Sequence, residues 1–546
     1  MSLFSKLFLL LATGCLFFPT VAAAQKPKKP NILLILADDL GYSDLGCYGG
    51  EIATPNLDEL AKNGLRFQQF YNGTRCCPSR ASLLTGLYPH QAGVGLMTGQ
   101  SSAPGYRGFP QPNTVTIAEV LRSAGYHTSM VGKWHLSAGP KTPRPTDRGF
   151  QEFYGMIGGF NSCFQENPFY TRLPADRPKR TYPADQFYSS DVFGDYSIDF
   201  LAKARAAKQP FFQYLAFNAP HFPLHAKPAD IQKYLQTYTV GWDKIRTARL
   251  KNQIEMGLFP QGTPLTPRSG FTTRRDFLRS GENPAWETLK KDRQTDLAYR
   301  MAVYAAMVNC MDENIGRIVA ELKKHGEYEN TLIFFLSDNG ACAEWDPFGF
   351  DGNSGPDNKL HTGTELATMG SAKTYHSYGS AWANASNTPF RLYKHYCHEG
   401  GIRTPLIVHW PQGVTAKGEF RPQVGHIIDI MATCVACAGA DYPTQRGEQK
   451  ITPMEGISLL PAFANQPLPR AMLAWEHEKN KAIRMGDWKL VAKDSQDWEL
   501  YDIAQDPLEM TNLASKEPER VAEMAKEWLT WANRTNVLPY PTKGKK

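Results

Sequence analysis

The sequence predicts an α/β protein, with a central and mostly parallel sheet flanked by helices and a smaller C-terminal antiparallel sheet with one helix. Three observations predict it: short apolar runs that each end in a polar cluster, helical segments between these runs, and a change to short strands after about residue 458. The 546 residues are 42% hydrophobic and 21% charged. This composition provides a large core and excludes global disorder or a coiled coil.

Residues 1–24 have the three regions of a secretory signal peptide. Lys6 precedes the apolar run Leu7–Val21, and three alanines end the segment. The run is short for a membrane span, and no later segment is long and apolar enough to cross a bilayer. We therefore expect a secreted or periplasmic protein without a membrane span, with lipoprotein anchoring at Cys15 as the lesser alternative.

Five apolar runs have the continuous character of strands that are buried on both faces of a parallel sheet. They are Asn31–Leu36, His127–Val131, Phe211–Phe217, Thr331–Leu336 and Pro405–His409. Between them, Thr116 predicts the N-cap of a helix, and Ala298–Leu322 repeats apolar residues at helical spacing. The succession of strand, helix and strand predicts one α/β domain over residues 25–458.

The C-terminal residues 459–546 predict a second, smaller unit. Three short strands separated by turn residues are expected at 481–484, 488–492 and 498–501. Residues 518–533 then place apolar side chains at helical spacing, which predicts an amphipathic helix. An antiparallel sheet with one terminal helix fits this pattern.

The net charge of the chain is +7, from 60 Lys and Arg against 53 Asp and Glu. Because this charge is spread over the whole length, we expect no nucleic-acid partner. Residues 244–293 form a polar insertion with 11 Lys and Arg against 5 Asp and Glu, an excess equal to the +6 of the mature chain. Removal of the signal peptide leaves nine cysteines, an odd number, so at least one has a role other than pairing.

Polar side chains follow the predicted parallel strands, at the sheet edge where ligands bind in open α/β sheets. They are Asp38, Asp39, Lys133, His135, His221, Asp338 and Asn339. Two carboxylates after one strand and an Asp-Asn pair after another supply only oxygen ligands, which favours calcium first and magnesium second over zinc. Alone, Asp38-Asp39 is typical of a helix N-cap, but the presence of Asp338-Asn339 after a second strand favours the metal site.

The segment Cys76-Cys77-Pro78-Ser79-Arg80 supplies a candidate nucleophile. Pro78 is suited to the first position of a helix, which would place Cys76 beside the free N–H groups of a helix N-terminus. Anions collect at such positions. A nucleophile at residue 76 would therefore face an anionic substrate.

This segment, with Thr85-Gly86 after it, resembles the signature of the sulfatase family, in which the first Cys of a Cys-x-Pro-Ser-Arg stretch is oxidised to formylglycine. Further motifs resemble the family's and occur in its order: NILLILADDLG at 31–41, GKWHL at 132–136, APH at 219–221, SDNG at 337–340, and Lys394 with EGGIRTP at 399–405. Three stretches are similar to bacterial arylsulfatases in particular: GGEIATPNLDEL at 49–60, YAAMV at 304–308 and RLYK at 391–394. The fold implied by this resemblance is that of alkaline phosphatase.

The resemblance also implies the cofactors and the reaction. Cys76 would be converted to formylglycine by a formylglycine-generating enzyme. The hydrate of this aldehyde carries two hydroxyls, of which one attacks sulfur with the help of the metal and the other later loses its proton and expels sulfate. The implied calcium ligands are Asp38, Asp39, Asp338, Asn339 and an oxygen of residue 76.

Each remaining site residue has a role by resemblance. Arg80 would stabilise the hydrate, and Lys133 and Lys394 would balance the charge of the sulfate oxygens. His135 would assist the elimination of sulfate, and His221 would protonate or hydrogen-bond the leaving oxygen.

We therefore predict a secreted, calcium-dependent sulfuric ester hydrolase of the arylsulfatase type, which releases inorganic sulfate from aryl or alkyl sulfates. The nearest alternative is a phosphonate or phosphate ester hydrolase of the same superfamily. A sulfated-polysaccharide sulfatase is a further alternative, because the basic insertion 244–293 would steer polyanions if it lay near the mouth of the site. A catalytically silent carbohydrate-binding relative is the non-enzymatic alternative.

Overall fold

The computed structural model describes residues 29–99, 101–137, 139–272, 280–344, 346–352 and 358–541. The predicted signal peptide with Cys15 and the arginines at 274, 275 and 279 lie outside the described residues. No helix within the described part of the chain is long and apolar enough to cross a membrane.

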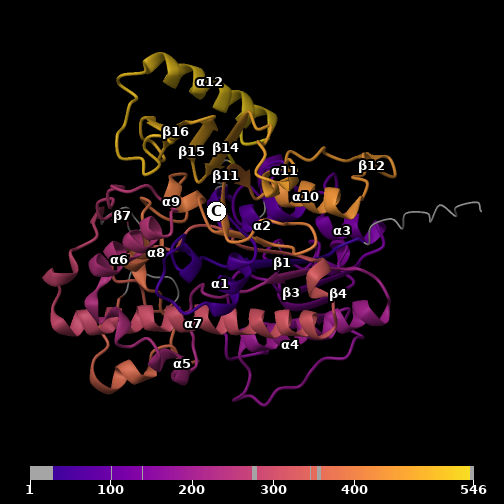
Figure 1. The fold of residues 1–546 in the computed structure, drawn as a ribbon, viewed down its shortest axis with the longest axis horizontal. Helices are drawn as coiled ribbons and strands as arrows, with labels where there is room; N and C mark the ends of the chain where they lie inside the picture. The colour runs from indigo at the N-terminus through magenta and orange to yellow at the C-terminus, as the bar shows by residue number, and fades with distance from the viewer. Residues whose placement is uncertain are drawn as a thin grey trace, which may run out of the picture.

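A nine-stranded sheet forms the centre of the molecule, in the order β11-β2-β10-β9-β1-β6-β3-β4-β5 (Figure 1). Most neighbours are parallel, including β1 with β6 and β9, and β3 with β4 and β6. The strands are β1 Asn31–Ala37, β2 Leu65–Tyr71, β3 His127–Lys133, β4 Glu152–Met156, β5 Thr171–Leu173, β6 Phe211–Ala216, β9 Thr331–Ser337, β10 Leu406–His409 and β11 Glu419–His426. The predicted fold class is confirmed.

All five predicted runs are strands, but one has the wrong direction. Strand β10 is antiparallel to both of its neighbours, β9 and β2. The prediction of a parallel strand rested on a continuous apolar run, which reflects burial on both faces of the sheet. A strand that is buried on both faces has such a run whether it is parallel or antiparallel to its neighbours. Strands β2, β4, β5 and β11 were not predicted.

Helices cover both faces of the sheet, so successive β1 side chains enter different cores. Leu33 and Ile35 pack in one core with α1 (Pro55–Lys62), α4 (Ser189–Ala206) and α7 (Lys291–Lys324). Ile32, Leu34 and Leu36 pack in the other core with α2 (Cys76–Thr85), α3 (Ile117–Ser123) and α10 (Asp429–Ala438) (Figure 1). The predicted cap is confirmed: Thr116 and Glu119 form a capping box at the start of α3.

The C-terminal unit is an antiparallel sheet covered by helix α12, as expected (Figure 1). Its elements are β14 Met472–His477, β15 Asn480–Met485, β16 Trp488–Ala492, β17 Glu499–Asp502 and α12 Pro518–Arg534. The predicted strands correspond to β15, β16 and β17, and β14 was not predicted.

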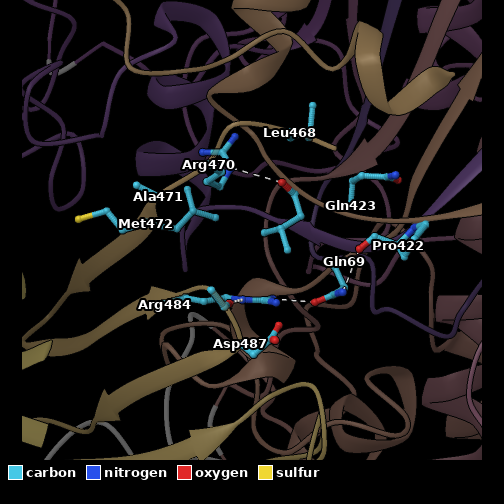
Figure 2. Close-up of a pocket in the computed structure, with 12 residues that line it drawn as sticks. Gln69, Pro422, Gln423, Leu468, Arg470, Ala471, Met472, Arg484 and Asp487 are labelled. Carbon is cyan, nitrogen blue, oxygen red and sulfur yellow. Dashed lines mark hydrogen bonds between the residues drawn. The ribbon is translucent and has the colours of Figure 1, made fainter. Parts of the chain in front are cut away.

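Side chains from both sheets meet at the joint between the two units, where they line a pocket of about 240 Å3 (Figure 2). Arg484 of β15 donates to Gln69 of β2 and to the Tyr71 hydroxyl, each at 2.7 Å. Arg470 donates to the carbonyl oxygen of Val424 at 3.3 Å. Both arginines therefore have hydrogen-bond partners, and these bonds connect the small sheet to the large one.

Part of the basic insertion is buried in the fold. Helix α6 (Trp242–Glu255) packs against α8 (Gly379–Ser386). Arg249 is 1% exposed and lies 2.7 Å from both Asp44 and Glu51. Some of the insertion's positive charge is thus neutralised internally and does not reach the surface.

Candidate active site

The pairing of β1 with β9 brings the predicted metal ligands together. The two strands are parallel, and Ala37 pairs with Ser337 at their carboxyl ends. The next residues of each strand therefore leave the sheet side by side. The backbone N–H of Asp39 donates to Asp338 Oδ1 at 3.2 Å, and the Asn339 amide donates to Asp39 Oδ1 at 2.6 Å.

Three buried cations neutralise the three buried carboxylates. Lys133, at the end of β3, lies 2.6 Å from Asp38 Oδ2. Arg80 of α2 donates to Asp338 Oδ2 from two nitrogens, at 2.9 and 3.1 Å. All three pairs, including Lys394 at 2.8 Å from Asp39, are at most 1% exposed. The formal charges of these six side chains sum to zero.

The carboxylates differ in acidity although all are buried. Burial and the charge of Asp38 together raise the pKa of Asp338 to about 7, against the opposing charges of Arg80 and Lys133. Burial also raises the pKa of Asp38, against the opposing charges of Lys133 and Arg80. At Asp39 burial acts in the same direction, but Lys394 and His221 outweigh it and hold the pKa below its ordinary value.

The oxygen atoms at the two strand ends fit a divalent cation. Asp38 Oδ1 and Asn339 Oδ1 are buried and have no hydrogen-bond partner. Buried polar atoms are rarely left without a partner, and a cation would satisfy both. The donors are carboxylate and amide oxygens, which suit a hard ion such as calcium or magnesium. Asp39 holds its position with a left-handed φ of 67°, a strained geometry that is frequent at functional sites.

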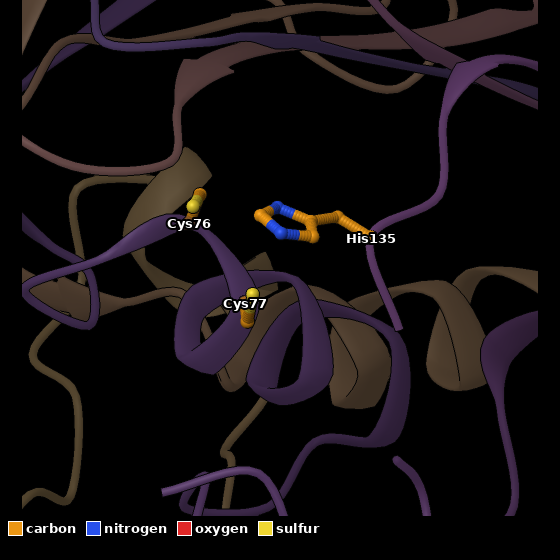
Figure 3. A group of neighbouring side chains, drawn as sticks. All are labelled: Cys76, Cys77 and His135. Atoms are coloured by element: carbon orange, nitrogen blue, oxygen red, sulfur yellow. The ribbon is translucent and has the colours of Figure 1, made fainter. Parts of the chain in front are cut away.

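Cys76 is the first residue of α2, so it lies at the helix N-terminus as expected (Figure 3). The expectation for Pro78 is wrong in detail, because the helix begins at Cys76 and Pro78 is its third residue. This position still lies in the first turn, where a missing N–H interrupts no helical hydrogen bond. Cys76 is 2% exposed.

His135 faces both cysteines in Figure 3. A nitrogen of its ring and the two sulfur atoms all lie within 4.8 Å of one another. A hydrogen bond from Cys77 lowers the pKa of the Cys76 thiol well below its ordinary value, and the charge of Lys133 acts in the same direction. Burial lowers the pKa of His135 to about 4, so this imidazole is neutral near pH 7.

His221 and Lys394 complete the site on the side of Asp39. His221 follows β6, and its Nε2 lies 3.4 Å from Asp39 Oδ2. Its Nδ1 lies 2.6 Å from the carbonyl oxygen of Phe222, which fixes the orientation of the ring. Burial lowers the pKa of His221 to about 4. The structure thus brings all ten predicted site residues into one buried cluster at the carboxyl edge of the sheet.

The structure places further ionisable residues next to the site that the sequence did not indicate. Arg75, which precedes Cys76, lies 3.5 Å from Glu344 and contacts His395. His395, which follows Lys394, lies 2.8 Å from Glu478 of the C-terminal unit. His395 has a left-handed φ of 81°. Their place in the sequence was the one feature that could have identified them, because Arg75 and His395 are each next to a predicted site residue.

A cleft of about 720 Å3 opens beside Lys394 and His395. Its lining includes residues of the loop around Lys394, the hairpin β7–β8 (Gly270–Thr272 and Ser280–Glu282) and the C-terminal unit, together with Ala343 and with Ser380 of α8. Phe271 represents the hairpin, and Trp498 is one of the C-terminal residues. The cleft is large enough for a substrate much bigger than a sulfate ion.

Comparison with known proteins agrees with this geometry. The family model described as Sulfatase matches residues 30–440, and that of the N-sulphoglucosamine sulphohydrolase C-terminal region matches residues 390–534. An uncharacterised sulfatase of Schizosaccharomyces pombe is 35% identical, over 94% of this chain and 95% of that protein. An arylsulfatase of Klebsiella aerogenes is also 35% identical, over 80% of this chain and 93% of its own length.

Among solved structures, Ps i-CgsB in complex with k-i-k-neocarrahexaose is similar to this chain. The TM-score is 0.64 with 27% identity, and the match covers 94% of this chain and 98% of that one. The match spans both the large sheet and the C-terminal unit, which supports the alkaline-phosphatase-like fold expected from the motifs. By the extent of these matches, the chain belongs to the sulfatase family, whose members hydrolyse sulfate esters.

Proposed function

We propose that this protein is an exported sulfatase that releases inorganic sulfate from aryl or alkyl sulfate esters. The observation that carries the proposal is the buried cluster around Cys76, in which three carboxylates, three cations and two histidines surround a helix N-terminus. Such a cluster provides ligands for a cation and donors for sulfate oxygens within one water-poor site. The predicted signal peptide supports secretion to the periplasm or the medium.

Asp38, Asp39, Asp338 and Asn339 would hold a calcium ion, or magnesium as second choice. A bound divalent cation supplies charge to polarise a sulfate oxygen and to activate a nucleophile. In that case Lys133 and Lys394, which now pair with Asp38 and Asp39, would no longer be needed to balance these carboxylates, and their ammonium groups would contact the sulfate.

Residue 76 would carry formylglycine, which supplies a hydrated aldehyde as nucleophile and a route for sulfate release by loss of a proton. Arg80 is anchored by Asp338 and by the backbone of Lys133, at 2.8 Å, so it is fixed near residue 76. His135, neutral and close to residue 76, would accept a proton there. His221, beside Asp39, would protonate or hydrogen-bond the leaving oxygen, and as an acid it would first have to take up a proton, because burial keeps its ring neutral near pH 7.

Mass spectrometry of the peptide that contains residues 76–80 tests the modification. We expect the peptide to have the mass of an aldehyde at residue 76 when the protein is produced with a formylglycine-generating enzyme, and that of a thiol when it is produced without one. Turnover should follow the aldehyde fraction. Full turnover by protein with an unmodified Cys76 thiol would contradict the proposal and would favour another nucleophile.

The choice between sulfate and phosphate is tested with matched substrates. We expect kcat/KM for p-nitrophenyl sulfate to exceed that for p-nitrophenyl phosphate and for a phenylphosphonate ester. The opposite order would favour the phosphate or phosphonate hydrolase of the same superfamily. Absence of turnover for all three, with the aldehyde present, would favour the silent carbohydrate-binding relative.

A second candidate function is the hydrolysis of sulfated saccharides. The cleft of about 720 Å3 beside Lys394 supports it, because a small aryl sulfate would fill little of this volume. Its lining combines aromatic, amide and carboxylate side chains, which are suited to stacking on sugar rings and to hydrogen bonding with hydroxyls. These residues include Phe271, Tyr396, Asn480, Gln496, Asp497 and Trp498. Comparison of a monosulfated oligosaccharide with p-nitrophenyl sulfate distinguishes the two candidates.

A further inference from the structure

Phe160 is exposed beside the active site. Among the residues that the structure describes, the exposed large hydrophobic side chains are four aliphatic ones and Phe160, which is 45% exposed. A single exposed apolar side chain is unremarkable on a protein surface. Phe160, however, lies next to His221 of the candidate active site.

The ring of Phe160 stacks on the ring of His221. Their centroids are 5.9 Å apart, and the planes differ by 12°. Phe222 and Tyr375 support Phe160 from other sides, with centroids at 5.3 and 6.2 Å. His221 itself is 5% exposed. Phe160 is therefore the most exposed ring of this aromatic cluster, in which Tyr375 is half-buried, and solvent or a substrate can reach it.

The backbone before Phe160 also lies against the site. The segment follows β4, and a Cβ atom at Gly159 would lie 2.6 Å from the ring of His135. A side chain at position 159 would push against the His135 ring, so glycine allows the chain to pass this close without displacing the histidine. Residues 159 and 160 thus lie against the two histidines of the cluster, Gly159 beside His135 and Phe160 beside His221.

We propose that Phe160 contacts the leaving group of the sulfate ester and favours substrates that carry an aromatic ring beside the sulfate. This inference rests on the proposed function, in which His221 serves the leaving oxygen. An ester oxygen at hydrogen-bond distance from His221 places the attached carbon skeleton within reach of the ring that covers His221. The exposed part of Phe160 then offers an aryl group an apolar surface and an aromatic stacking partner.

The test compares Phe160→Ala with the unchanged enzyme on two sulfates, p-nitrophenyl sulfate and trifluoroethyl sulfate. A direct contact predicts a loss of kcat/KM of about tenfold for the aryl ester and of no more than about twofold for the compact alkyl ester. A role through His221 alone predicts the reverse order. Nitrophenolate is a good leaving group without protonation, whereas trifluoroethoxide needs a proton from an acid. If the substitution acted only by displacing His221, kcat/KM for the alkyl ester would therefore fall more than kcat/KM for the aryl ester.

Two further variants complete the experiment. Phe160→Tyr keeps the ring and should retain aryl turnover within about twofold. Leu529→Ala removes an equally exposed apolar side chain, 47% exposed on α12, and should change neither rate. Equal losses for the two substrates, a greater loss for the alkyl ester, or no loss at all would each overturn the contact. If the unchanged enzyme hydrolyses neither ester, the proposed function fails as well, so the two failures are distinguishable.

Discussion

Lys489 of the C-terminal sheet lies 2.7 Å from Glu399, which belongs to the large α/β unit. The same ammonium group lies 2.8 Å from Glu509, and all three side chains are fully buried. Glu399 also accepts a hydrogen bond from the Tyr71 hydroxyl at 2.9 Å and one from Arg403 at 3.2 Å.

Glu399 is the first residue of the segment EGGIRTP, which packs against the loop that carries Asn339. A Cβ atom on Gly340 of that loop would lie 1.8 Å from the carbonyl oxygen of Gly400.

Substitution of Lys489 should destabilise the whole protein. Lys489→Met leaves two buried carboxylates without their shared cation, and we expect a loss of about 3–5 kcal/mol in the free energy of unfolding at pH 7. Denaturant unfolding measures this change. The matched control is Lys526→Met on the exposed face of α12, expected within about 0.5 kcal/mol of the unchanged protein. Equal free energies of unfolding for the two variants would show that the buried ion cluster does not contribute to stability.

The same cluster predicts a dependence of stability on pH. Burial would raise the pKa of Glu399, but Lys489 and Arg403 outweigh it and lower the pKa from an ordinary 4.5 to about 2. Because the folded state holds the lower pKa, the ionised form stabilises the fold above pH 4.5 or so, and this contribution is lost as the pH falls towards about 2. Glu399→Gln should therefore flatten the unfolding free energy in this window. Glu448→Gln, at an exposed position, should leave the slope unchanged.

Much of the candidate site was predictable because its residues follow the apolar runs directly. Asp38 and Asp338 are the first residues after strands whose central residues are all apolar, and parallel pairing then brings them together. Cys76 was predictable from its motif and from the helix signal around it. Roles remain predictions for all ten residues, since proximity alone does not assign a proton or a ligand.

Other features depend on contacts that leave no local pattern. Strand β10 runs antiparallel because of the path of the chain around it, which its four residues do not record. Arg75, Glu344 and Glu478 meet His395 from separate parts of the sequence. Phe160 is one aromatic residue among many until the fold brings it onto His221. Such residues become candidates only when the fold is known.

Substitution of the candidate nucleophile should abolish turnover and preserve the fold. Cys76→Ala removes the side chain that formylglycine formation requires, and we expect the hydrolysis of p-nitrophenyl sulfate to fall to the background rate. Alanine at the first position of α2 is compatible with the helix, so the free energy of unfolding should change by less than about 1–2 kcal/mol. Near-normal hydrolysis by this variant would show that the proposed mechanism is wrong.

Removal of a proposed metal ligand should remove metal and activity together. Asp338→Ala deletes a carboxylate that also anchors Arg80, and we expect elemental analysis to find stoichiometric calcium or magnesium in the unchanged enzyme and little in the variant. Chelation should inactivate the unchanged enzyme, and added calcium should restore it. Asp441→Ala, at an exposed carboxylate, is the control. Stoichiometric zinc in active enzyme would contradict the assignment of an all-oxygen site.

Charge in the insertion 244–293 should affect only substrates with several charges. Arg274, Arg275 and Arg279 lie outside the described residues, and in the sequence they follow Phe271, which lines the cleft beside Lys394. Replacing the three arginines with serine should lower kcat/KM for a sulfated oligosaccharide at low salt and should weaken its salt dependence. Hydrolysis of p-nitrophenyl sulfate, with one charge to steer, should change little. If the oligosaccharide and the small ester respond alike at every ionic strength, the insertion does not steer polyanions, and its charge serves the fold, as the buried Arg249 does.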